Sequence, residues 1–215
     1  MSTTPVQSER PYYEPSTRVT GDWSAHIATT LDRTAVVLRD LDEAQWAAPS
    51  MCEGWSVRDV VGHIIWRTGT PTREMLRLGR EAIVGGRLSP SRDMDRFARE
   101  VAEAPVGDLV QTMHDIADQK VHGLGRSGVT ELTEAVVHAY DVTEALGLPL
   151  RLSPRSTSAV AIARGKVPFS GARRRLARNE YFASDTRWRI GSGPRVEGTA
   201  GQIIMELFGR RAVPR

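Results

Sequence analysis

The chain has 215 residues, of which 40% are hydrophobic, so it can bury a core in one large domain or in a domain with a small appendix. Its formal net charge is only +3, and no run of about 18 apolar residues is present that could span a bilayer. The first twenty residues are polar and lack the apolar core of a signal peptide, so we expect a cytoplasmic protein with no membrane partner.

The N-terminal part predicts a lead-in followed by a helix. Residues 1–20 contain three prolines and no apolar period, which favours a flexible segment. From Trp23 to Leu41 the apolar residues recur at the spacing of an amphipathic helix. We therefore predict the first helix of the fold over this stretch.

The next two helices are predicted from their start signals. Ser56 and Asp59 form a helix-start signature, and the helix that follows bends or breaks near residues 69–71. A polar, glycine-containing link is expected around Gly85 to Pro90. Pro105 can occupy the first turn of a third helix over about residues 106–122.

A fourth helix is predicted from Thr130, a suitable N-cap, to Gly147, a suitable C-cap ahead of Pro149. No strand pattern interrupts these four blocks. Residues 21–150 therefore predict an antiparallel four-helix bundle.

Residues 151–215 predict a small α/β domain, so the fold class is mainly α with a C-terminal α/β appendix. Residues 157–164 and the arginine-rich stretch 172–178 favour helices, residues 180–198 favour two or three short strands, and residues 199–210 favour a closing helix. The Gly-x-Gly sequence at 191–193 is interpreted as a hairpin turn.

The arginine-rich stretch is the main basic feature of the chain. It has no interleaved aromatic residues and no recognisable nucleic-acid-binding module, so we predict no nucleic-acid partner. It is interpreted as a solvated helix face or as a patch that attracts small carboxylates. Lysine occurs only at Lys120 and Lys166, and such a bias toward arginine is typical of a GC-rich genome.

Glu134 and His138 stand four residues apart on the fourth helix and so project from one face. Such a pair is more often an ordinary ion pair on a wet surface. Here the rest of the helix is largely apolar, so the stripe of Glu134, His138 and Asp141 is expected to be buried, where it needs a partner or a metal. Asp141 is interpreted either as an orienting partner of a ligand or as part of a solvent-exposed salt bridge.

His63 lies at the border of the apolar stripe of the second helix. A lone histidine there is more often a satisfied core residue than a ligand, but helical bundles build metal sites from side chains on facing helices. Two imidazoles and one carboxylate suit Zn²⁺, although other divalent metals accept similar donors. Three protein ligands leave an open position for water or a thiolate, which points to catalysis.

Three further residues allow two readings. The single Cys52 excludes an internal disulfide and is interpreted as a small packing residue rather than a nucleophile or a ligand. Trp46 and Trp55 are expected to pack at the end of the bundle, with a ligand-lining role as the alternative.

Two segments of the chain resemble the mycothiol-dependent maleylpyruvate isomerase family, a branch of the DinB-like metalloenzymes. One is LDEAQWAAPSMCEGWSVRDVVGHI, which ends in His63 and Ile64, and the other is EAVVHAYDVTEALG, which begins at Glu134. The tail that ends in Leu-Phe-Gly-Arg is similar to the family's C-terminal appendix, but residues 165–180 match no part of the family pattern.

The resemblance implies a DinB-like bundle whose His63, Glu134 and His138 bind zinc, and mycothiol, the low-molecular-weight thiol of actinobacteria, as cosubstrate. It implies addition of a thiolate to a small electrophile, in an isomerase or an S-transferase. Arg210 is then the candidate that holds a substrate carboxylate, with a role as a cation at a helix C-terminus as its alternative. We expect a monomer or a homodimer.

Two other classes of function compete with this hypothesis. One is a metal-dependent hydrolase in which bound water replaces the thiol. The other is a noncatalytic binding member of the same fold.

Overall fold

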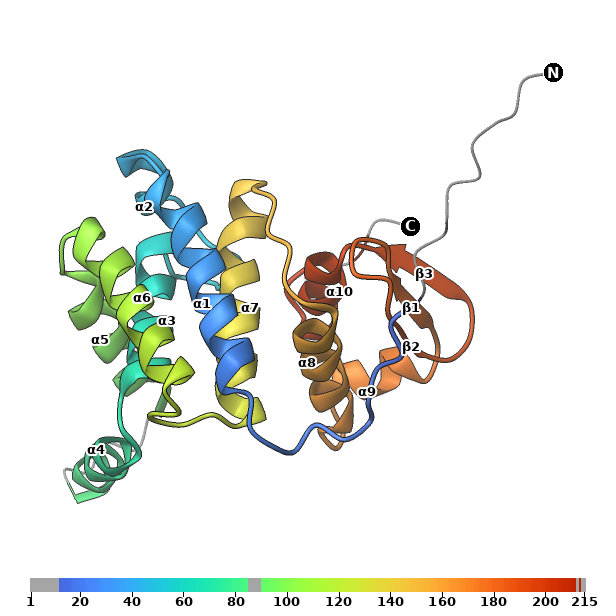
Figure 1. Ribbon diagram of the computed structural model, residues 1–215, viewed down its shortest axis with the longest axis horizontal. Helices are drawn as coiled ribbons and strands as arrows, with labels where there is room; N and C mark the ends of the chain where they lie inside the picture. Colours follow the sequence, from blue (N-terminus) through green and yellow to red (C-terminus); the bar gives the residue numbers. More distant parts are fainter. Residues whose placement is uncertain (1–11, 85–89, 212, 214–215) are drawn as a thin grey trace.

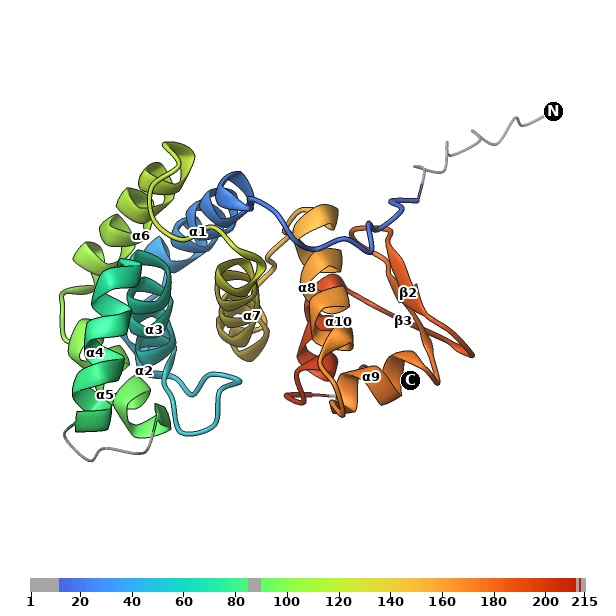
Figure 2. The same cartoon turned by 90° about the horizontal axis from the view of Figure 1, so that it is seen from below.

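The structure, a computed structural model, describes residues 12–84, 90–211 and 213. A bundle of long helices lies beside a smaller unit of helices and strands, as Figures 1 and 2 show, so the predicted mainly-α fold with a C-terminal α/β appendix is confirmed. None of the helices in these ranges is long and apolar enough to cross a membrane. The helices of the bundle side are α1 (Ser24–Arg39), α2 (Glu43–Ala47), α3 (Val57–Gly69), α4 (Thr72–Val84), α5 (Pro90–Ala102), α6 (Val106–Val121) and α7 (Val129–Leu146).

Four helices, α1, α3, α6 and α7, close into the bundle, and each contacts two of the others along its length. Figure 1 shows that α1 runs antiparallel to α6 and α3 runs antiparallel to α7, whereas α1 and α7 run in the same direction. The backbone N–H of Trp23 donates to the carbonyl of Ser127 at 2.8 Å, which joins the starts of α1 and α7. The long connection through α4 and α5 carries the chain from the end of α3 to the start of α6, and so allows this arrangement of parallel and antiparallel helices.

The second predicted helix ends where the sequence indicates a break, since α3 stops at Gly69 and α4 begins at Thr72. The expected link around Gly85 to Pro90 lies, except for Pro90, outside the described residues. Sequence analysis assigns no helix to residues 91–102, whereas the structure has α5 there, packed along α3. Its apolar residues, among them Phe97, Ala98 and Val101, recur at helical spacing, so the sequence could have predicted this helix.

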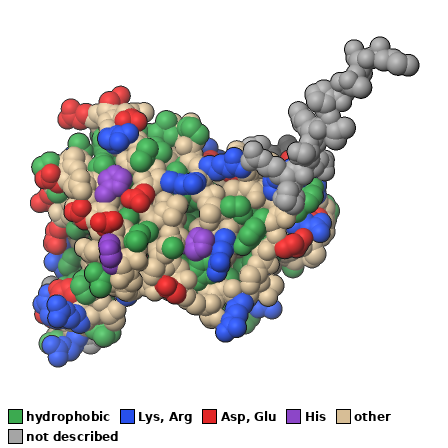
Figure 3. Space-filling view, viewed as in Figure 1, with side chains coloured by type: hydrophobic (Ala, Val, Ile, Leu, Met, Phe, Trp, Pro, Cys, Tyr) green, Lys and Arg blue, Asp and Glu red, His purple; other side chains and the backbone are tan. Residues whose placement is uncertain are grey.

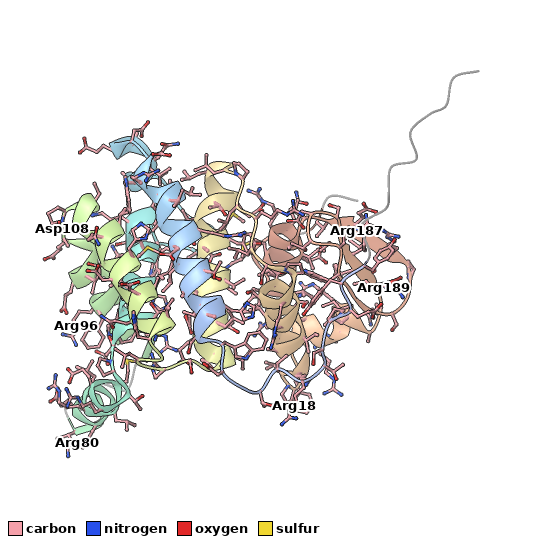
Figure 4. All side chains as sticks on the ribbon, in the orientation of Figure 1. Arg18, Arg80, Arg96, Asp108, Arg187 and Arg189 are labelled. Atoms are coloured by element: carbon pink, nitrogen blue, oxygen red, sulfur yellow. The ribbon has the colours of Figure 1, made fainter. Side chains whose placement is uncertain are left out.

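Helix α4 stands apart from the bundle in Figure 1, and arginine side chains gather over it in Figure 3. Arg77 pairs there with Glu74 and Glu81, and Arg80 points away from the protein in Figure 4. The surface of α4 is therefore largely solvated.

Helices α3 and α5 approach each other closely at Gly62. A Cβ atom added to Gly62 would lie 2.2 Å from the carbonyl oxygen of Ala98 and 3.0 Å from the backbone nitrogen of Ala102. Both atoms belong to backbone and cannot swing aside. The absence of a side chain at this position therefore sets the distance between the two helices.

We expect Gly62→Ala to lower the free energy of unfolding by about 1–3 kcal/mol, because overpacking forces the two backbones apart. Thermal denaturation should show this as a Tm lower by roughly 2–4 °C for each kcal/mol. The matched control is Gly107→Ala on α6, where an added Cβ meets no atom within 4 Å. Equal stability of the two variants would show that the close approach does not constrain the bundle.

The C-terminal unit contains α8 (Pro154–Lys166), α9 (Gly171–Leu176), β1 (Glu180–Ala183), β2 (Arg189–Gly191), β3 (Arg195–Gly198) and α10 (Ala200–Leu207). The sheet has the order β2-β1-β3, with β1 antiparallel to β2 and parallel to β3. The predicted helices and short strands are therefore confirmed. The hairpin turn predicted at residues 191–193 is wrong, because β2 and β3 lie on opposite sides of β1; the tight turn instead joins β1 to β2.

A second cluster of buried residues lies between this sheet and α10, with Tyr181, Trp188 and Ile203 at its centre, separate from the core of the bundle. The described part of the N-terminal segment reaches the same unit, since the backbone N–H of Tyr13 donates to the carbonyl of Arg187 at 2.9 Å. The division into residues 1–20, 21–150 and 151–215 stays a prediction, which the two separate cores support.

Candidate metal centre

Helix α7 carries the polar stripe into the interior. Glu131 Oε2 accepts from the backbone N–H of Gly128 at the start of the helix, and Gly147, in the left-handed region at φ 65°, ends it. Between them, His138 Nε2 lies 3.4 Å from Glu134 Oε2, as the spacing of four predicts. The side chains of Glu134 and His138 are 23% and 12% exposed, so both are largely buried, and both contact α3.

Helix α3 brings the third predicted residue to the same point. Its start is fixed by Ser56 and Asp59, whose side chains each bond to the backbone of the other, as the sequence predicts. One turn further along, His63 is 4% exposed, and its Nε2 lies 3.1 Å from Glu134 Oε2. Arg67, one turn beyond His63, donates from Nη2 to the other oxygen, Glu134 Oε1, at 3.1 Å. The carboxylate of Glu134 is thus held from both helices.

The three groups differ in their affinity for protons. Burial raises the pKa of the Glu134 carboxyl, but hydrogen bonds with His138 and His63 outweigh it and hold that pKa far below its usual range. Burial lowers the pKa of His138, but hydrogen bonds, the one to Asp141 foremost, raise it well above its ordinary value. Burial lowers the pKa of His63 despite its hydrogen bond to Glu134. Without a cation, Glu134 is therefore balanced by protonated His138 and by Arg67.

Asp141 anchors the other side of the His138 ring. It is fully buried, and its Oδ2 lies 2.9 Å from His138 Nδ1. This leaves Nε2 of His138 facing Glu134 and His63. This geometry agrees with an orienting role for Asp141. The alternative, a solvent-exposed salt bridge, is wrong, because Asp141 is fully buried.

Arg210, just after α10, reaches across to the same aspartate. Its Nε donates to Asp141 Oδ1 at 3.0 Å and its Nη2 lies 3.0 Å from Cys52 Sγ. The loop that carries Cys52 is fastened to α7, because the backbone N–H of Met51 donates to the carbonyl of Asp141 at 2.9 Å. Cys52 packs against the core of the bundle, as predicted, and also contacts Arg210. The C-terminal unit therefore contributes directly to this end of the bundle.

Aromatic side chains form one wall of the cluster. The Trp55 ring centroid lies 5.0 Å from that of His63, and its indole N–H donates to Asp95 on α5 at 3.0 Å. Trp66 lies 5.9 Å from the His63 ring and stacks on Phe97 of α5 at 5.1 Å. Trp55 thus lines the cluster, which was the alternative interpretation of this residue. Trp46, in contrast, is buried in the core, as expected.

Among the described residues, two groups bring three potential ligand atoms within 4.8 Å of one another: His63, Glu134 and His138, and also Cys52, His138 and Asp141. In the second group the Arg210 guanidinium already supplies a cation to Asp141 and Cys52. In the first group, two imidazole nitrogens converge on one carboxylate oxygen. These residues fit a divalent metal ion, and His138 then has the second-sphere carboxylate that metal-bound histidines usually have.

Arg67 and Trp66 were not predicted as parts of the cluster. Arg67 could have been found, because it lies four residues after His63 on the same helical face. The contacts of Trp66 depend on α5, which the sequence analysis does not assign. The remaining histidines lie apart from the cluster: His26 contacts Ser156, His114 contacts Asp32, and the ring of His122 contacts the backbone of Asp118.

Comparisons with known proteins give one family and two solved structures. Residues 27–80 match the family model described as the mycothiol maleylpyruvate isomerase N-terminal domain. The crystal structure of the mycothiol-dependent maleylpyruvate isomerase, and that of a histidine-to-alanine mutant of it, each align with 12% identity and a TM-score of 0.48, covering 88% of this chain and 89% of theirs. No curated protein matches the chain. Over α1, α3 and most of α4, the chain thus resembles the mycothiol-dependent maleylpyruvate isomerase family, as its sequence predicts.

Proposed function

We propose that this protein is a metal-dependent enzyme that adds the thiolate of mycothiol to a small electrophilic substrate. The observation that supports the proposal most directly is the convergence of His63 and His138 on Glu134 at a wall of the bundle. The match of residues 27–80 to the mycothiol maleylpyruvate isomerase N-terminal domain supports the thiol. Zinc is the proposed metal because its preferred ligands include imidazole and carboxylate.

His63, Glu134 and His138 would hold the ion, with one position left open. A bound divalent ion lowers the pKa of a thiol, so that the thiolate is available near neutral pH. Asp141 keeps the Nδ1 proton of His138 and so presents Nε2 to the centre. Arg67 holds the second oxygen of Glu134 and limits its rotation. The aromatic wall restricts the access of water from the side of α5.

Arg210 is the residue we propose to bind a substrate carboxylate. Its Nε and Nη2 are engaged by Asp141 and Cys52, whereas its Nη1 has no hydrogen bond to any described residue. Burial lowers the pKa of Arg210, but the negative charge of Asp141 raises it by more. The pKa of Arg210 is therefore raised overall, and the guanidinium stays charged. Arg210 contacts Asp141, which in turn contacts His138, so a carboxylate bound by Arg210 would lie near the metal centre.

Two reactions share the first step of this chemistry. The thiolate adds to one carbon of an activated double bond while the other carbon, stabilised by the adjacent carbonyl, takes up the electron pair. In an isomerase the new single bond rotates, and elimination of the thiolate restores the alkene in its trans form. In an S-transferase the second carbon is protonated and the adduct is released.

Turnover is expected to depend strictly on the thiol. The purified protein would be incubated with mycothiol and a panel of electrophiles that includes cis-unsaturated dicarboxylates, and substrate loss and product geometry would be followed by chromatography. We expect no turnover when mycothiol is omitted. The matched control is His63→Ala with the same thiol, which should also be inactive. Turnover without any thiol would instead favour the hydrolase.

A further inference from the structure

A polar cavity of about 420 Å³ opens beside α9, away from the residues of the metal centre. Its walls come from α9, from the residues that link α9 to β1, and from the last turn of α10. The residues that line it are Gly171, Arg174, Arg175, Arg178, Asn179 and Glu206. Three of these six residues are arginines, so the cavity has a strongly positive wall.

Two of the three arginines have no acidic partner within the part of the chain that the structure describes. No ion pair there involves the side chain of Arg174 or Arg178, and both residues are exposed. Arg175 is held instead, with its Nε 3.9 Å from Glu206 Oε1. Glu206 is itself buried and accepts from the Tyr181 hydroxyl at 2.5 Å and from the backbone N–H of Val213 at 2.7 Å. The cavity therefore keeps two positive charges in excess.

The arrangement of these charges needs an anion to offset it. Arg174 lies on the last turn of α9 and Arg178 lies two residues beyond the end of that helix, and both line the same cavity, where their like charges repel each other. The dipole of α9 favours cations at the C-terminal end of the helix. It does not explain why a cavity lies between the arginine side chains. The guanidinium of Arg175 lies against the backbone of Gly171, since a Cβ atom added to Gly171 would lie 2.8 Å from Nη1 of Arg175.

We propose that this cavity binds the phosphate group of a small phosphorylated compound or free phosphate. Guanidinium groups bind phosphate and carboxylate through paired N–H donors. A carboxylate offers only two oxygens to three arginines, whereas a phosphate dianion offers three or more and carries the two negative charges that the cavity lacks. The side-chain amide of Asn179 adds a neutral donor. This site is separate from the proposed metal centre and does not depend on the function proposed there.

Titration calorimetry at low ionic strength tests the proposal with three probes: inorganic phosphate, glycerol 3-phosphate and AMP. We expect saturable binding near one equivalent for at least one of them, weakened by added NaCl because the groups are partly exposed to solvent. Arg174→Gln and Arg178→Gln should each lower the affinity on the order of tenfold, as expected for the loss of one charge-assisted contact. The order of the three affinities distinguishes free phosphate from a phosphate ester.

The matched control is Arg173→Gln. Arg173 lies on the same turn of α9 and is as exposed as Arg174, but it does not line the cavity, so its substitution should leave the affinity within about twofold, because only the weak, screened field of its charge reaches the bound anion. A loss as large as that of Arg174→Gln would overturn the proposal in favour of a nonspecific basic surface. Absence of saturable binding by all three probes, or binding only to vesicles of anionic lipid, would overturn it as well.

Discussion

Replacing His138 with alanine is expected to abolish stoichiometric metal binding. The wild-type protein, purified without added metal, should contain about one divalent ion per chain, as expected for three protein ligands. The variant should bind the ion more than about a hundredfold more weakly, since loss of a residue that merely supports a ligand already costs roughly 10–100-fold. Elemental analysis gives the stoichiometry, and competition with a chelator of known affinity gives the change in affinity. Turnover should fall to the background rate.

The control for this experiment is His114→Ala. His114 lies on α6 and its Nδ1 pairs with the exposed Asp32, away from the metal centre, so its loss should change neither metal content nor turnover. Circular dichroism of both variants would establish that the bundle remains folded. Retention of one ion by His138→Ala, or a wild-type protein that contains no metal and gains no stability from added zinc, would contradict the proposed centre.

The sequence predicts the bundle well where helices have one apolar face and clear end signals. Ser56 with Asp59 fixes the start of α3, and Gly147 fixes the end of α7, because these residues satisfy the free backbone groups of a helix end locally. The order of the helices in space could not be predicted in this way. It depends on α5, whose helical pattern of apolar residues was missed, and on packing between distant segments such as Gly62 against Ala98.

Part of the candidate metal centre could likewise be predicted from local sequence spacing, and part of it could not. The spacing of Glu134 and His138 predicts that they share a face, and their distance in the structure agrees with it. His63 is linked to them only through the packing of α3 against α7, which the sequence indicates by family resemblance rather than by any local pattern. The contact of Arg210 with Asp141 joins residues 69 positions apart, and it depends on where the C-terminal unit sits.

The second large effect is expected from breaking the ion pair between Asp141 and Arg210. Asp141 has no exposed surface, and the Arg210 side chain is 28% exposed. Asp141→Asn removes the negative charge but keeps the shape, so Arg210 is left with a partly buried charge and a weaker partner. Breaking a fully buried pair typically costs about 3–5 kcal/mol. Because solvent screens part of the Arg210 charge, we expect a loss of about 2–3 kcal/mol in the free energy of unfolding.

The same substitution is expected to weaken metal binding, because Asp141 positions His138 rather than contacting the ion. The affinity should fall roughly 10–100-fold, less than for His138→Ala, while about one ion still binds at saturating concentration. An Asp32→Asn variant, which alters the carboxylate that contacts His114 on the surface, is the matched control and should change neither quantity.

A double-mutant cycle separates the structural role of Asp141 from its role toward the metal. Arg210→Met, combined with Asp141→Asn, should show a coupling energy of about 1–3 kcal/mol in urea denaturation of the metal-free protein, since the two side chains touch directly. The metal affinity of the double variant should nevertheless match that of Asp141→Asn alone, because His138 loses the same carboxylate in both. If the affinity instead recovers when Arg210 is removed, Asp141 acts on the ion through the arginine, and the proposed path from Asp141 through His138 is wrong.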